Sequence, residues 1–169
     1  MLSLVSPHNA AAASAREIDI EVDAALQRFY NQVDTAKAFA QQAAGVLVFP
    51  SVIKAGFGLG GEYGEGALRM GGKTVEYYST AAASIGFQVG AQAKTVILVF
   101  LDKAALKNFR HAPGWEAGVD GSVALVKWGV GRSLDTTNIQ DPIVGFVFGN
   151  KGLMYNLTLE GSKFTKLKR

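Results

Sequence analysis

The sequence contains no cysteine among its 169 residues. Disulfide bonds and thiolate metal sites are therefore excluded, and cysteine usage carries no information about the redox compartment. Long apolar runs are also missing: the longest, Val96–Leu101, is far shorter than the ~20 residues that a membrane-spanning helix needs. The apolar fraction of 49% and the charged fraction of 18% are nevertheless typical of one folded domain.

Positive charge is concentrated at the end of the chain. Outside residues 161–169 the sequence holds 13 basic and 14 acidic residues, so the net charge of +3 comes from the last nine. This distribution disfavours nucleic acid as a partner and favours contact with an anionic surface. We expect a flexible lead over residues 1–15, a single domain over 16–162 and a basic tail over 163–169. The lead lacks the basic and apolar regions of a signal peptide.

Glycines alternate with other residues in the segment Gly45–Gly72. They occupy even positions at Gly56, Gly58 and Gly60, and again at Gly64 and Gly66. Because side chains alternate across a strand, this pattern predicts strands with one bare backbone face. Such a face allows another backbone, a helix or a ligand to approach closely.

Three helices are expected. Apolar residues at helical spacing predict one over Ala10–Tyr30 and a shorter one over Gln32–Ala44, and Asp102 is the expected N-cap of a third over Lys103–Arg110. The first helix has two interpretations, insertion into a membrane interface or packing on a sheet. Its acidic polar face favours packing.

The remaining periodicity is that of strands. We expect Thr95–Leu101 to be buried on both faces because it is apolar and β-branched throughout. The other expected strands are Val46–Phe49 (ended or kinked by Pro50), Lys54–Gly61 paired with Gly66–Met70 through a turn at Glu62–Glu65, Thr74–Ala91 with a bend at Ala81–Ala83, Val119–Arg132, and a hairpin of Ile143–Phe148 with Leu153–Leu159. The predicted fold class is α+β, with a curved, mostly antiparallel β-sheet or partial barrel, N-terminal helices and one internal short helix.

Two sets of residues resemble catalytic or cofactor motifs only weakly. Gly56, Gly58 and Gly61 match the spacing GxGxxG, but the residues that follow are a poor helix, so strand packing is the favoured interpretation. A Ser-His-Asp catalytic set would have to combine His111, at a helix end, with residues such as Ser122 and Asp120. The sequence has no nucleophile-elbow motif to support such a set.

Glu62 and Glu65 are an acid/base pair only if they converge, and in a turn they are expected to be solvated. We therefore expect no catalytic residue, no metal site and no cofactor.

Three blocks of the sequence resemble the SYLF domain family: Gly45–Gly66, Ile85–Gln92 with the apolar strand after it, and Gly152–Ser162, which ends in a leucine-glutamate-glycine motif. The resemblance implies a non-enzymatic lipid-binding domain, since animal members are associated with phosphoinositides and fungal members with actin bundling. The stand-alone arrangement is similar to that of bacterial envelope lipoproteins, which are anchored through a lipidated N-terminal cysteine absent from this sequence. We therefore expect a location in the bacterial periplasm, at a membrane.

The expected partner is an anionic phospholipid or membrane surface. Lys54 is the motif residue that the resemblance suggests as a headgroup contact, and charge adds Arg69, Lys73, Lys163, Lys166, Lys168 and Arg169. The alternative is an interaction protein that binds a protein partner through its sheet edges or its basic end.

Overall fold

A computed structural model describes residues 13–34, 36–55, 61–83, 93–126, 141–149, 152–153 and 158–169. Within these residues three helices accompany one sheet of nine strands. The helices are α1 (Ala15–Gln32), α2 (Ala36–Gln42) and α3 (Lys103–His111), and the strands are β1 (Gly45–Ala55), β2 (Gly61–Met70), β3 (Lys73–Ala83), β4 (Ala93–Phe100), β5 (Trp115–Glu116), β6 (Ala124–Leu125), β7 (Ile143–Gly149), β8 (Gly152–Leu153) and β9 (Lys163–Leu167).

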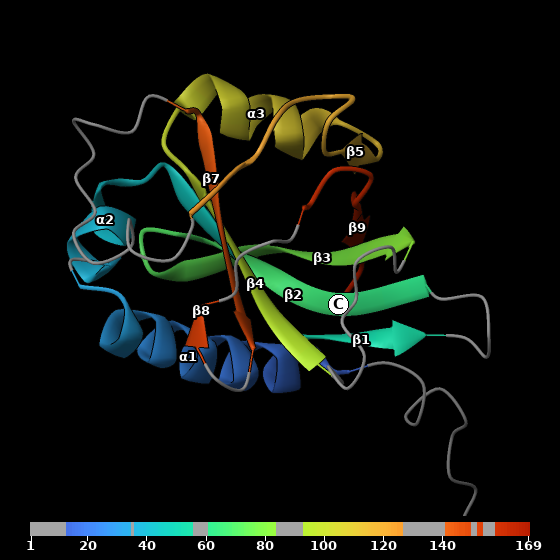
Figure 1. Cartoon of the computed structure of the whole chain (residues 1–169). Helices are drawn as coiled ribbons and strands as arrows, with labels where there is room; N and C mark the ends of the chain where they lie inside the picture. Colours follow the sequence, from blue (N-terminus) through green and yellow to red (C-terminus); the bar gives the residue numbers. More distant parts are fainter. Residues whose placement is uncertain are drawn as a thin grey trace, which may run out of the picture.

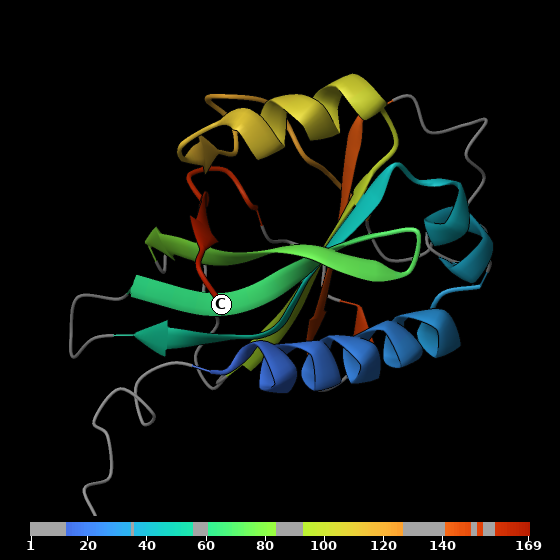
Figure 2. The ribbon, with the colours of Figure 1, turned by 180° about the vertical axis from the view of Figure 1, so that it is seen from behind.

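The strands follow one another across the sheet in the order β5-β9-β3-β2-β1-β4-β7-β6, and β8 pairs with β7. Every pairing is antiparallel except that of β6 with β7. The sheet curls, with α1 on one side and α3 on the opposite side (Figures 1 and 2). The expected α+β class, with a curved and mostly antiparallel sheet, is confirmed.

The hydrophobic core has two parts, one on each face of the sheet. Side chains of α1 and α2 pack on one face, and side chains of α3 pack on the other. The strand β4 contributes to both: Ile97 and Val99 lie in the first part, whereas Val96, Leu98 and Phe100 lie in the second. The prediction that this strand is buried on both faces is confirmed.

Helix α1 buries its apolar stripe of Ile18, Val22, Ala25 and Phe29 against the sheet. It begins at Ala15, later than expected, because the side chain of Ser14 accepts a hydrogen bond from the backbone N–H of Glu17 and caps the helix. The expected first residue, Ala10, lies outside the described residues.

Helix α2 is shorter than the predicted Gln32–Ala44. Val33 is the C-cap of α1 and is buried, which separates the two helices, and Gly45 is already the first residue of β1.

Two outcomes were expected at Pro50, an end of the strand or a kink. Strand β1 does not end there. It continues to Ala55, with a shift of register against β2 between Val48 and Ser51. A bulge at this point accommodates a residue that has no backbone N–H to donate. The carbonyl of Pro50 still accepts a hydrogen bond from Thr95 Oγ1, at 2.8 Å.

Strand β2 corrects the expected turn at Glu62–Glu65. These residues lie inside the strand and pair with β1 and β3 on either side. Residues 56–60, which connect β1 to β2 and include Gly56, Gly58 and Gly60, lie outside the described part of the chain.

The bare backbone face is present at Gly64 and Gly66. A Cβ atom on Gly64 would lie 2.8 Å from the carbonyl oxygen of Ser51, and one on Gly66 would overlap the carbonyl oxygen of Val48. The close approach expected from the glycine pattern is thus an approach of neighbouring backbone.

Strand β3 begins after the expected turn, where Gly71 and Gly72 adopt positive φ angles of 59° and 81°. Ala81–Ala83 continue the strand instead of bending, since β2 pairs with them. Residues 84–92, which include the second family block, are not described.

A strand was expected over Val119–Arg132. Within the described part of this range, the structure has only the short strand β6. Val119 and Asp120 lie in a turn whose backbone N–H groups bond to the carbonyl of Glu116. Residues 127–140 fall outside the description.

The hairpin of β7 and β8 is confirmed by the pairs Phe148↔Leu153 and Gly149↔Gly152. The predicted second strand, Leu153–Leu159, does not reach its expected end: Thr158 and Leu159 belong to no strand, and a turn follows at Glu160 and Gly161.

Lys163–Leu167 form β9, an inner strand of the sheet between β5 and β3. Phe164 is only 2% exposed and contacts the rings of Phe49, Phe109 and Trp115. Five residues of the expected basic tail therefore form a strand, which buried Phe164 holds in place among exposed cations. The division of the chain at residues 15 and 162 stays a prediction.

Candidate functional site

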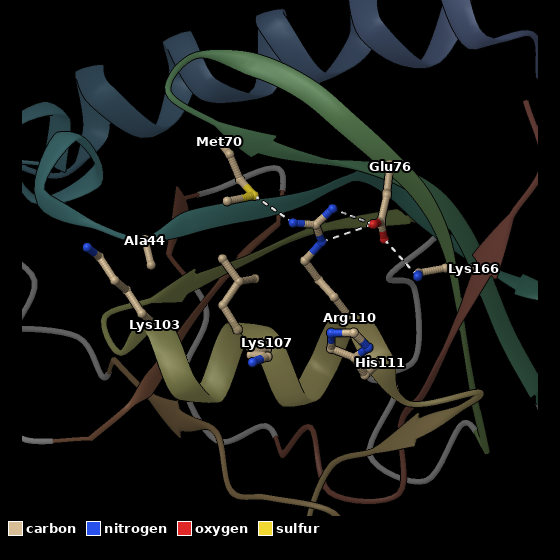
Figure 3. A pocket seen from close by; sticks show the side chains of 9 residues that line it. Ala44, Met70, Glu76, Lys103, Lys107, Arg110, His111 and Lys166 are labelled. Carbon is tan, nitrogen blue, oxygen red and sulfur yellow. Dashed lines mark hydrogen bonds and ion pairs between the residues drawn. The ribbon is translucent and has the colours of Figure 1, made fainter.

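A cavity of about 430 Å³ opens between α3 and the sheet. Its lining combines basic side chains with an apolar floor and one carboxylate (Figure 3). We call it the α3 groove, and define it by its lining residues Ala44, Met70, Glu76, Lys103, Leu106, Lys107, Arg110, His111 and Lys166.

Helix α3 determines the arrangement of the basic groups. The carboxylate of Asp102 accepts a hydrogen bond from the backbone N–H of Ala104 and caps the helix as expected. Buried Leu106 and Phe109 attach it to the sheet. Lys103, Lys107 and Arg110 follow the spacing i, i+4, i+7, so they lie along one side of the helix and line the groove over about 10 Å.

The inner end of the groove contains a network centred on the carboxylate of Glu76 in β3. Arg110 donates to Glu76 Oε1 from Nε at 2.9 Å and from Nη2 at 2.6 Å. Tyr78 donates its hydroxyl to Oε2 at 2.7 Å, and Lys166 Nζ lies 3.4 Å from the same oxygen. Figure 3 shows Arg110 and Lys166 approaching this carboxylate from different elements.

The network keeps Glu76 ionised. Burial alone raises the pKa of this carboxyl, but the hydrogen bonds from Tyr78 and Arg110 and the charges of Arg110 and Lys166 outweigh burial and lower the pKa below its ordinary value of 4.5. Burial, and then the hydrogen bond to Glu76, raise the pKa of the Tyr78 hydroxyl. The tyrosine therefore remains a hydrogen-bond donor.

The outer end of the groove has unneutralised charge. Lys103 and Lys107 are exposed, and no carboxylate in the described part of the chain forms an ion pair with either. Four cations and one carboxylate thus line the cavity. Cations in a recess with apolar walls attract anions more strongly than the same cations on a flat surface, because the field is concentrated there.

Six of the cations predicted to contact a lipid headgroup have described side chains. Of these six, Lys166 lines the groove. Lys73, Lys163 and Lys168 are exposed elsewhere on the surface. The register Ala81↔Lys163 and Tyr78↔Lys166 places Lys163 and Lys166 on opposite faces of β9. The side chain of Lys54 lies outside the description, although its backbone is part of β1.

The two predicted arginines bind carboxylates of the chain itself. Arg69 is 13% exposed and contacts α1 through Asp23 Oδ1 at 2.8 Å and Asp19 Oδ1 at 3.9 Å. Arg169 Nη2 lies 2.6 Å from Glu65 Oε2. A headgroup role for either guanidinium stays a prediction, and it would require these ion pairs to break.

Sequence reasoning missed Lys103, Lys107 and Arg110. The signal was available, since three cations at helical spacing follow a recognised N-cap. It was outweighed by the denser basic cluster at the end of the chain.

The weaker catalytic interpretations lose their geometric basis. Glu62 and Glu65 lie on opposite faces of β2, where Glu62 pairs with Lys94 at 2.9 Å and Glu65 with Arg169. They therefore form no acid/base pair, and they are not the solvated turn residues we expected. Gly61 opens a strand instead of the helix that a dinucleotide site needs. The carboxylate of Asp120 accepts the backbone N–H of Glu116 at 2.7 Å.

The described residues contain neither a metal-binding cluster nor a membrane-spanning helix. No group of three or more histidine, aspartate and glutamate residues is arranged there to hold a metal ion. No helix in this part of the chain has the length and hydropathy to cross a membrane.

The described residues thus combine a curved, mostly antiparallel sheet with a basic recess between α3 and the sheet. A family model matches residues 81–169, more than half of the chain, and its description is Ysc84, Las17-binding protein actin regulator. The chain therefore belongs to the Ysc84 family, the SYLF family that the three blocks resemble. No curated protein matches the chain.

Proposed function

We propose that this protein is a non-enzymatic module that binds the headgroups of anionic phospholipids in the α3 groove. One observation carries the proposal: Lys103 and Lys107 have no carboxylate partner in the described residues and stand beside two further cations, Arg110 and Lys166. Phosphate recognition requires charge and hydrogen-bond donors, and these side chains supply both.

The size of the groove supports a ligand that enters it. A volume of about 430 Å³ lies within the range of small-molecule sites, which is roughly 300–1,000 Å³. Leu106, Met70 and Ala44 provide apolar surface beside the cations. A phospholipid offers both chemistries, a phosphate for the cations and apolar atoms next to it.

The energetic scale favours weak, salt-sensitive attachment. Each basic group near an anionic membrane contributes on the order of 1 kcal/mol, and screening by salt reduces this contribution. Lys103 and Lys107 should supply most of it, since Arg110 and Lys166 already interact with Glu76.

We further propose the bacterial periplasm as the location, with the protein held at a membrane of the cell envelope. The support is the resemblance of the three sequence blocks to a family that occurs in bacterial envelope lipoproteins. Fractionation of cells that express the gene tests this: the protein should be found with envelope membranes, and recovery from the cytosolic fraction would contradict the proposal.

The test of lipid binding is co-sedimentation with vesicles of phosphatidylcholine and increasing phosphatidylglycerol, at low and high salt. The test variant is Lys103→Gln with Lys107→Gln, and its matched control is Lys73→Gln with Lys168→Gln, which removes the same charge outside the groove. We expect the groove variant to lose roughly tenfold or more in affinity, on the scale of about 1 kcal/mol per charge. The control should lose much less.

Equal losses in both variants would mean that net charge alone attracts the protein to the vesicle. Absence of binding by the unaltered protein at low salt would overturn the lipid proposal. Circular dichroism of each variant checks that the fold is retained.

A protein partner is the second candidate function, and the family description favours it by naming Las17 binding and actin regulation. The same basic groove would suit an acidic segment of such a partner. Co-sedimentation with purified actin filaments tests this directly. Pelleting with filaments, lost in the Lys103/Lys107 variant, would support this second function, and pelleting only with vesicles would exclude it.

A further inference from the structure

The inner end of the α3 groove already contains an anion, the carboxylate of Glu76. It accepts two hydrogen bonds from Arg110 at 2.6 and 2.9 Å and lies 3.4 Å from Lys166 Nζ. These two cations come from different elements, α3 and β9, and converge on this side chain of β3 (Figure 3). The carboxylate therefore occupies the position that an incoming anionic group would need in order to contact both cations.

The two ends of the groove differ in what they offer a ligand. Lys103 and Lys107 at the outer end are available, because no described carboxylate pairs with them. Arg110 and Lys166 can bind a ligand only if their ion pairs with Glu76 break. An anion with a single negative charge gains little by that exchange, since it replaces one carboxylate with a group of equal charge.

A phosphate monoester differs in charge and in acceptors. It carries about −1.5 to −2 charges at pH 7 and three strong acceptor oxygens, whereas a phosphodiester carries one charge. The doubly charged group can attract Arg110 and Lys166 more strongly than Glu76 does.

On the basis of the proposed headgroup site, we infer that Glu76 is a specificity-determining residue that competes with the ligand for Arg110 and Lys166. It keeps singly charged phosphodiester headgroups at the outer lysines and admits phosphate monoesters to the inner end. The ligand class is thereby narrowed to lipids that carry a terminal phosphate.

The arrangement around Glu76 supports a positioned competitor. Tyr78 donates its hydroxyl to Oε2 at 2.7 Å, on the oxygen that Arg110 leaves free. The side chain of Arg110 also lies 3.3 Å from the sulfur of Met70 through Nη1. Arg110 is thus fixed at the boundary between the polar and apolar parts of the groove.

The test compares two sets of vesicles with the same calculated surface charge, one containing phosphatidylglycerol and the other phosphatidic acid. The protein as it stands should bind the phosphatidic acid vesicles several-fold more tightly. Glu76→Gln should strengthen binding to phosphatidylglycerol by roughly fivefold, the effect of one charge near a membrane, and so reduce the preference. Glutamine keeps the shape and an acceptor oxygen for Tyr78 or Arg110.

Glu21→Gln is the matched control, because it removes one exposed carboxylate from α1 on the other side of the sheet. The inference is overturned if Glu76→Gln and Glu21→Gln change binding equally, or if the ratio between the two lipids stays constant. If neither the parent protein nor Glu76→Gln binds either vesicle, the proposed function itself fails. Urea unfolding of Glu76→Gln shows whether the variant is folded when binding is measured.

Discussion

Gly66 shows at the residue scale how closely two strands approach in this sheet. The position of its missing Cβ is occupied by the carbonyl oxygen of Val48, with Phe49 Cδ1 2.8 Å away. Backbone cannot yield as the end of a flexible side chain can, so any side chain at this position must displace β1. The sequence predicted this bare face from the alternation of glycines alone.

Gly66→Ala should therefore lower the free energy of unfolding by about 3 kcal/mol, the upper part of the usual range for overpacking. Chemical denaturation measures the change. Gly71→Asn is the control, since no atom lies within 4 Å of its Cβ position and asparagine tolerates the φ of 59°. Equal stability of Gly66→Ala and the parent protein would contradict the close approach of β1 and β2.

Glu76 gives a prediction about pH. Its pKa in the folded protein is below the ordinary value of 4.5, despite burial, because Tyr78 and Arg110 donate to it. The stability that the carboxylate provides is therefore complete above about pH 4.5 and is lost as the pH falls through the lower folded pKa. The difference in unfolding free energy between the parent protein and Glu76→Gln should shrink between pH 6 and pH 3. A difference that grows with acid would contradict the network.

Charge in the sequence did not reveal which cations are free. Arg69 and Arg169 looked like candidates for phosphate binding, yet carboxylates distant in sequence bind both of them. Such partners depend on strand register and helix packing, which composition does not specify. Lys103 and Lys107 stand at helical spacing in the sequence, but only the fold shows that this side of α3 lines a cavity.

At the scale of elements, Arg69 connects α1 to the β2–β3 hairpin. Its guanidinium donates to Asp23 at 2.8 Å, to the carbonyl of Asp19 at 3.2 Å and to Thr74 Oγ1 at 2.7 Å. Asp19 in turn accepts hydroxyl hydrogen bonds from Thr74 and Tyr77. The side chain thus serves the packing of α1, on the face of the sheet opposite to α3.

Arg69→Gln should reduce the free energy of unfolding by about 1.5–3 kcal/mol, the usual scale for hydrogen bonds to charged groups. Binding to anionic vesicles should change little, because Arg69 lies away from the groove. Denaturation and co-sedimentation on the same sample measure the two effects. A large loss of binding with unchanged stability would instead make Arg69 a ligand contact.

The N-cap of α1 gives an independent check on the helix start. Ser14→Ala removes the acceptor that lies 3.1 Å from the N–H of Glu17, and a loss of about 1 kcal/mol is expected. Ser14→Asp retains an acceptor and should restore most of the stability. No effect of either change would mean that the helix begins elsewhere.

Most elements could be predicted because their signals are local. Asp102 with the apolar spacing of α3, the β-branched run of β4 and the turn at Gly71–Gly72 each specify their structure within a few residues. Strand β9 could not be predicted from such a local signal, because lysines flank its one buried residue, Phe164. Its place depends on pairing with β3, which is about 85 residues away in sequence.

For the whole molecule, the basic end of the chain is part of the sheet. β9 joins β5 to β3, and Phe164 is packed among aromatic side chains of α3, β1 and β5. Removing this segment would thus do more than remove four cations. It would expose an edge of β3 and open the core beneath α3.

A chain that ends at Ser162 should accordingly lose its cooperative unfolding transition or unfold several kcal/mol more easily. Phe164→Ala alone should destabilise by about 3–5 kcal/mol. Thermal denaturation followed by circular dichroism measures both, with Lys168→Gln as a surface control. A truncated chain as stable as the parent would show that β9 is not an integral strand.

Headgroup binding in the α3 groove is the central claim, and chemical-shift mapping by nuclear magnetic resonance tests it most directly. A short-chain phosphatidic acid would be titrated, below its micelle concentration, into isotope-labelled protein. The account predicts saturable shifts at the amides of α3 and β9 and at the Arg110 Nε–H, with little change in α1. Shifts confined to other elements, or none at millimolar lipid, would contradict it.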